Sequence, residues 1–102
     1  MYEFMELVGY IWAALMDAQD MAHEAIENKH DHPDLAAAYY RIANDRVNHA
    51  EALTKQASDC LELARRNDVE DLDEMQAVWT ADHGRLVKQM THTKIMMDMY
   101  RG

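Results

Sequence analysis

Arg46 and His49 are polar residues set into an otherwise apolar helical pattern. At 100° per residue, both fall on the same face as the apolar residues that recur between positions 35 and 64. A cation on a core-facing stripe is costly unless an acid pairs with it. The two residues therefore predict either a structural polar layer or a site for a ligand, metal or partner. The apolar members of the stripe are Leu35, Tyr39, Ile42, Ala50, Leu53, Ala57, Cys60 and Ala64.

Neighbours for this pair follow from folding the chain back near residues 32 and 68. Matching residues by height then places Asp17 within a turn of Arg46, and it places Gln89 on the inward face at mid-length. A structural layer of this kind would fix helix register. The predicted buried polar layer consists of Asp17, Asp45, Arg46, His49 and Gln89.

His23, Glu27 and His30 form a second arrangement that could do chemistry. Their i, i+4, i+7 spacing puts two imidazoles and a carboxylate on one helical face, a set that can hold a divalent metal. They lie at an expected helix end, so we interpret them as a weak candidate for adventitious binding and expect no cofactor. The chain also carries no glycine-rich phosphate loop and no nucleophile elbow, and we expect a protein that is not an enzyme.

The elements that would position these residues are three long helices, at about 2–29, 34–66 and 71–100. Apolar residues recur at helical spacing in each segment, and three glycines and one proline leave little turn punctuation. Pro33 and Asp34 suit a first helical turn, and Asp68 and Asp71 are both candidates to precede the third helix. Short connections favour antiparallel neighbours. The prediction is a single all-α domain over 1–102, an antiparallel three-helix bundle.

Composition limits the partners. A net charge of −9 disfavours direct binding to nucleic acid or to an anionic membrane. The single cysteine, Cys60, excludes an intramolecular disulfide, and its place on the apolar stripe predicts burial. The chain contains no apolar run long enough for a membrane span, and its acidic opening residues lead us to expect no signal peptide. These features predict a cytoplasmic protein.

Large apolar residues off the core stripes predict self-association. A three-helix rod is thin, and leaving such residues in water is costly, so a second chain would be expected to cover them. An alternative is that these side chains wrap the edges of the core. The candidate interface residues are Met5, Trp12, Met16, Ile95 and Met99.

The segment from Tyr39 to Glu51 resembles the E-x-x-H-A-E-x-L helices of ferritin-like proteins. The resemblance implies a helical bundle with a carboxylate and histidine metal site, although Arg46 stands where that motif has its first Glu. The whole chain is similar to small acidic helical proteins of phages and prophages of gut Firmicutes. That similarity lies in an opening M-Y-E-F, the central Y-Y-x-x-A…H-A-E-x-L and a terminal M-x-M-Y-R. It implies a phage protein acting in the cytoplasm of its bacterial host.

Two classes of function are compatible with these features. The first is a non-enzymatic homo-oligomer that binds another protein, in its sharper form an acidic inhibitor of a host nucleic-acid-binding factor. Rows of carboxylates would then imitate phosphates, either on the first helix or around the second turn (Glu62, Asp68, Glu70, Asp71, Asp73 and Glu74). The alternative is that these rows are ordinary solvated acidic faces. The second is a ferritin-like metal-binding or redox protein with a degenerate ligand set. A virion assembly role is not separable from the first class by sequence.

Overall fold

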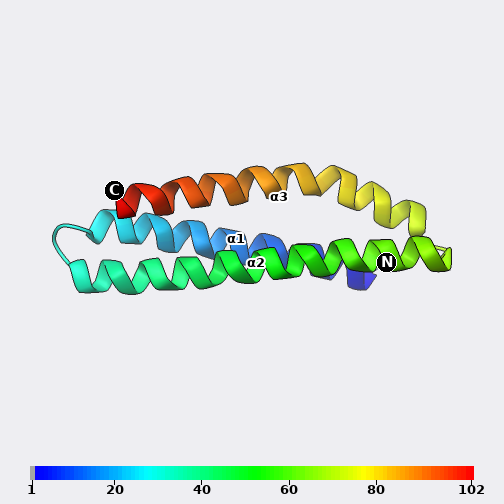
Figure 1. Ribbon diagram of the computed structural model, residues 1–102, viewed down its shortest axis with the longest axis horizontal. Coiled ribbons are helices and arrows are strands. Elements are labelled where there is room, and N and C mark those ends of the chain that lie inside the picture. The colour runs from blue at the N-terminus through cyan, green and yellow to red at the C-terminus, as the bar shows by residue number, and fades with distance from the viewer. Residues whose placement is uncertain (1) are drawn as a thin grey trace.

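The computed structural model is a narrow rod of three helices. It describes residues 2–102, with side chains from residue 3 onward. Helix α1 spans Tyr2–Asn28, α2 spans Pro33–Asn67 and α3 spans Leu72–Arg101, and no strand occurs among the described residues. They run up, down and up along a body of 55 × 18 × 17 Å (Figure 1). The predicted all-α bundle is confirmed, and each helix end lies within one residue of its predicted position.

The two turns end and restart the helices through different residues. Pro33 is in the first turn of α2, and His32 precedes it at the N-cap position. At the second turn Asp71 precedes α3, as predicted. Asp68 instead ends α2, in the left-handed conformation with φ 48° and ψ 51°. The N–H of Val69 donates to the carbonyl of Ala64 at 3.3 Å, closing the last turn. The prediction that Asp68 could begin a helix is therefore wrong.

Asp68 is the one described non-glycine residue with a positive φ, and this makes a stability prediction possible. We expect Asp68→Gly to raise the free energy of unfolding by about 0.5–1 kcal/mol, because glycine adopts this conformation without steric cost and the carboxylate no longer faces the negative end of α2. Urea denaturation would measure the change. Asp68→Asn is the control, since it removes the charge and keeps a side chain. Loss of stability in the glycine variant would contradict this account.

Small residues line the seam between α1 and α2. A buried alanine returns every seventh residue along α2, and alanines continue the seam on the second half of α1. Small side chains let helix backbones approach closely, and α1 and α2 are the most closely packed pair in the bundle. The buried alanines are Ala36, Ala43, Ala50, Ala57 and Ala64 of α2, and Ala14, Ala18, Ala22 and Ala25 of α1.

This seam corrects the inward face predicted for α2. Ala50, Ala57 and Ala64 are buried as expected, but Leu35 and Ile42 are exposed. Their neighbours Ala36 and Ala43, together with Val47 and Leu61, take the inward positions instead. Close approach to α1 favours the smaller side chains, so the larger residues of the predicted stripe lie along its outer edge.

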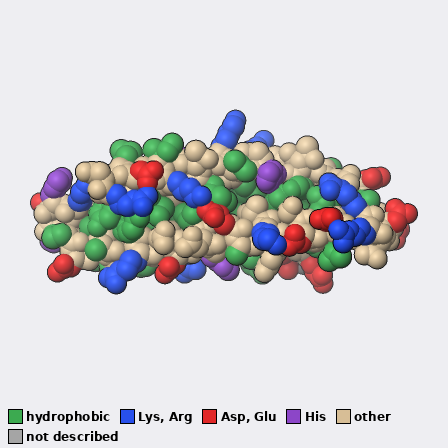
Figure 2. Space-filling view, in the orientation of Figure 1, with side chains coloured by type: hydrophobic (Ala, Val, Ile, Leu, Met, Phe, Trp, Pro, Cys, Tyr) green, Lys and Arg blue, Asp and Glu red, His purple; other side chains and the backbone are tan. Residues whose placement is uncertain are grey.

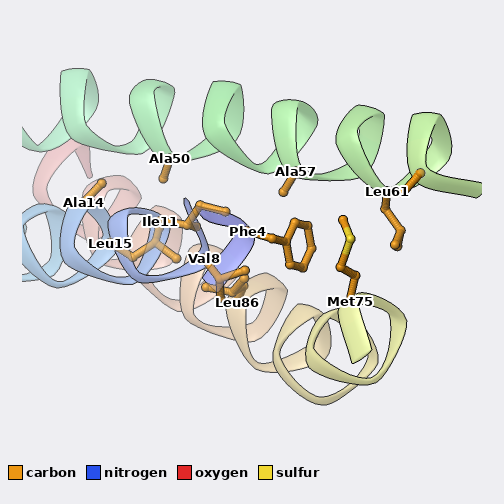
Figure 3. Close-up of a cluster of buried hydrophobic side chains, with 11 residues drawn as sticks. Phe4, Val8, Ile11, Ala14, Leu15, Ala50, Ala57, Leu61, Met75 and Leu86 are labelled. Carbon is orange, nitrogen blue, oxygen red and sulfur yellow. The ribbon is translucent and has the colours of Figure 1, made fainter. Parts of the chain in front are cut away.

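Larger side chains fill the half of the bundle nearer the second turn. Ile11 and Leu15 of α1 and Leu86 of α3 are fully buried in one cluster, which Phe4 and Met75 extend toward the end of the rod (Figure 3). A second cluster joins Ala18, Ala22, Ala43, Val47 and Met97 near the first turn. Helix α3 packs mainly on α1 and least on α2. The α2–α3 side is therefore the most open side of the rod.

Candidate functional site

The predicted polar layer is on the surface. Arg46 and Asp17 form the expected ion pair, with 4.0 Å between Nε and Oδ2, but their side chains are 50% and 64% exposed. Asp45 and His49 are also exposed. The prediction of a buried layer is wrong, because the inner face of α2 is centred on its alanines and Arg46 lies at the edge of that face.

Gln89, the fifth residue of that layer, has a different partner. Its side-chain amide donates to the side-chain oxygen of Gln19 on α1, and both residues are half-buried. Next to it, the hydroxyl of the fully buried Thr93 donates to the carbonyl of Gln89 at 3.0 Å. The polar contact at mid-bundle thus joins α1 to α3. The inward position of Gln89 in the sequence pattern correctly indicated a polar contact inside the bundle. The same pattern did not identify Gln19, because Gln19 lies between the core face and the outer face of α1.

The exposure of Arg46 sets a prediction for its replacement. We expect Arg46→Ala to lower the free energy of unfolding by less than about 1 kcal/mol, because an exposed pair at 4.0 Å is well solvated. A buried pair would instead lose about 3–5 kcal/mol when one partner is removed. Asp17→Ala is the matched variant, and chemical denaturation measures both. A loss in the larger range would show that the pair is buried in solution.

The metal candidates do not assemble. His23 and Glu27 contact each other, with 3.0 Å between Nε2 and Oε1, and both are largely exposed. His30 lies in the exposed first turn. Among residues 2–102, no group of three histidine, cysteine, aspartate or glutamate side chains is arranged to hold a metal ion.

The candidate interface residues divide into two kinds. Met5, Met16, Ile95 and Met99 are exposed, as expected of an interface. Trp12 is half-buried and packs against the core cluster. For Trp12 the alternative interpretation holds, since its ring wraps the edge of the core.

A groove of about 400 Å³ opens between α2 and α3 near the first turn. Val47 and Met97 form its buried floor, and Lys94 crosses it to Glu51 with 2.6 Å between Nζ and Oε1. Figure 2 shows apolar atoms between charged side chains along this side of the rod. The rim carries both signs of charge and is partly closed by this ion pair.

Aromatic stacking closes the same end of the molecule. The rings of Tyr40 and Tyr100 stack with centroids 4.9 Å apart. Lys29 lies 5.7 Å from the Tyr100 centroid, and Arg101 lies 5.8 Å from the Tyr40 centroid. These contacts hold the end of α3 against α2 and the first turn. The aromatic and basic residues at this end therefore have a structural role.

A second hollow lies at the opposite end of the rod, and we call it the end hollow. It has a volume of about 370 Å³, and most of its lining is apolar: Phe4, Cys60, Leu63, Ala64, Val69 and Met75. Glu3, Asn67 and Asp71 complete the lining. Leu63 is 57% exposed, and Val69 and Cys60 are exposed as well. The predicted burial of Cys60 is therefore wrong.

The end hollow lies in the most acidic part of the molecule. Residues 3–9 and 55–81 hold nine of the 19 acidic residues and three of the ten basic ones. Two of those bases are engaged on their own helix: Lys55 lies 3.1 Å from Asp59, and Arg66 lies 2.8 Å from Glu62. Carboxylates gather at the tip formed by the second turn, at the right of Figure 2. An apolar hollow thus lies beside a region of net negative charge.

Comparison with protein-family models, with curated proteins and with solved structures found no match for this chain. In the described chain, no helix combines the length and the apolar character needed to cross a membrane.

Proposed function

We propose that this protein is a non-enzymatic binding module that engages a basic protein through the acidic end of its rod. The observation that carries the proposal is the end hollow, whose exposed apolar lining lies among carboxylates. Exposed apolar surface rimmed by polar groups marks interaction sites in soluble proteins. Charge of one sign around it selects a partner of the opposite sign and speeds the encounter.

Nucleic-acid-binding proteins are the partner class that we infer. Their binding surfaces are basic because they neutralise phosphates. Carboxylates on neighbouring helical turns, as around the second turn here, can occupy such a surface in place of phosphates. A protein of net charge −9 is itself repelled by nucleic acid, so it would compete with nucleic acid for the partner. If a phage encodes this protein, the competition would take place in the cytoplasm of the bacterial host. It would inhibit a nucleic-acid-binding protein of that host.

Capture from a bacterial lysate, followed by competition, tests the proposed function. The immobilised chain is expected to retain basic nucleic-acid-binding proteins, which should be released by duplex DNA and by raising the NaCl concentration to about 0.5 M. Each captured protein, once purified, should lose DNA binding as the chain is added. Retained proteins that keep their DNA in the presence of the chain would overturn the inhibitory function.

We also propose that the protein self-associates through exposed apolar residues away from the acidic end. The outer stripe of α2 consists of two exposed residues, Leu35 and Ile42. The outer stripe of α3 consists of Ile95 and Met99, which are also exposed. Both pairs lie toward the first turn, where charge opposes association of two copies less than at the acidic end. Light scattering at about 50 µM tests this proposal, and the expected result is a mass above that of one chain. A single-chain mass would overturn it.

A further inference from the structure

We infer that the end hollow receives an apolar side chain from a basic amphipathic helix of the partner. The inference rests on the proposed function and deepens it, because it names the segment that is recognised and the place where it binds. The occupant is a helix that presents a large aliphatic residue with lysine or arginine on either side. Three features of the end hollow lead to this conclusion.

The first feature is the shape of the rod at this end. The turn joining α2 to α3 reaches beyond the start of α1 along the long axis (Figure 1). Elsewhere in the bundle, α1 lies beside the other two helices. Among the described residues, Glu3 and Phe4 are the part of α1 that lines the hollow, beside the last turn of α2 and the first turn of α3. A helix of the partner that docks there packs against exposed side chains of α2 and of the second turn.

The second feature is an apolar floor that is already fixed. Phe4 and Met75 are buried and point toward each other beneath the hollow (Figure 3). Phe4 also packs edge-on against Trp79, with ring centroids 6.1 Å apart. The exposed side chains of Leu63 and Val69 form the upper lining. A volume of about 370 Å³ falls within the range of about 300–1,000 Å³ that is typical of binding clefts.

The third feature is charge, which decides between possible occupants. Glu3 and Asp71 line the hollow, and Glu70, Asp73 and Glu74 are close in the sequence around the second turn. A second copy of this chain would bring the same carboxylates against them, and like charges brought together oppose association. A basic helix reverses the sign of that interaction. The hollow therefore favours a basic partner over a second copy.

A model peptide provides the probe. We would use a helical peptide of about 18 residues with leucine on one face and lysine on the other, labelled with a fluorophore. Two analogues share its length: one replaces every lysine by glutamate, and the other replaces every leucine by serine. Fluorescence anisotropy should show binding of the parent peptide, weakened about tenfold or more for each analogue, because both the apolar and the ionic contact are required.

Cys60 reports whether the peptide occupies the hollow. It is the single cysteine, it is exposed, and it lines the hollow. The parent peptide should slow the alkylation of its thiol by iodoacetamide, an uncharged reagent, by about fivefold or more at saturation. The control is the double variant Cys60→Ser/His30→Cys, which carries its thiol in the first turn at the other end. There the peptide should leave the rate unchanged.

Two matched sets of variants test the apolar and ionic contacts separately. Leu63→Gln should weaken peptide binding about tenfold. The control is Val87→Gln, because Val87 is also exposed (45%) but does not line the hollow. Glu70→Gln/Glu74→Gln should weaken it about threefold at about 50 mM NaCl, with the difference lost at about 0.5 M. The control is Asp31→Asn/Asp34→Asn, the corresponding positions around the first turn.

The outcomes separate this inference from the proposed function. Peptide binding that protects Cys60 and is weakened by Leu63→Gln supports the inference. Binding that leaves Cys60 reactive places the basic partner elsewhere, which overturns the inference and leaves the proposed function standing. Equal binding of the glutamate analogue overturns the basic character of the occupant. If no peptide binds and the lysate experiment yields no partner displaced by DNA, both proposals fail.

Discussion

Ala50→Leu is expected to lower the free energy of unfolding by about 2–3 kcal/mol. Ala50 is fully buried in the middle of the α2 seam and points toward Ile11 and Ala14 of α1 (Figure 3). The added isopropyl group has no space there, so it must force the two most closely packed helices apart or strain neighbouring side chains. Thermal and urea denaturation monitored by circular dichroism would measure the loss.

Ala52→Leu is the matched control for this substitution. Ala52 lies two residues away on the same helix and is exposed. Ala52→Leu therefore makes the same change in side chain and helix propensity without crowding the seam. The free energy of unfolding of this variant should stay within about 0.5 kcal/mol of that of the parent protein. Equal effects of the two substitutions would show that α1 and α2 do not approach closely at Ala50.

The helices themselves were predictable because strong local signals mark their ends. Pro33 and the polar residues around position 70 interrupt three long periodic segments, and the structure keeps every boundary within one residue. The face that α2 turns inward was harder to predict. Ile42 and Ala43 are adjacent, and hydrophobicity alone favours burial of Ile42. The structure buries Ala43, because the space available beside α1 depends on the partner helix as well as on α2.

The same limit applies to the functional residues. Matching heights along the helices correctly paired Arg46 with Asp17, since pairing depends mainly on where the chain turns. Burial of that pair depends on helix rotation, and there the prediction failed. The end hollow left little signal in the sequence because it depends on how side chains of α1, α2, the second turn and α3 come together in space. Leu63 and Val69, apolar residues next to an acidic turn, were the visible hint.

Trp12→Glu is expected to lower the free energy of unfolding by about 3 kcal/mol. Trp12 packs against the core cluster near the second turn, so the substitution removes apolar contact and places a carboxylate at the edge of the core. Chemical denaturation at low protein concentration measures this loss without a contribution from self-association. An unchanged unfolding midpoint would show that Trp12 does not belong to the core.

Met16→Glu separates folding from self-association on the same face of α1. Met16 lies one turn beyond Trp12 but is 42% exposed, so the new carboxylate can remain hydrated. Its effect on the unfolding of a single chain should stay below about 1 kcal/mol. If this face of α1 is buried between copies, Met16→Glu should shift the protein to a single-chain mass in light scattering while the helices remain folded. An oligomer that persists in Met16→Glu would exclude this face of α1 and leave the outer stripes of α2 and α3 as the surfaces where two copies meet.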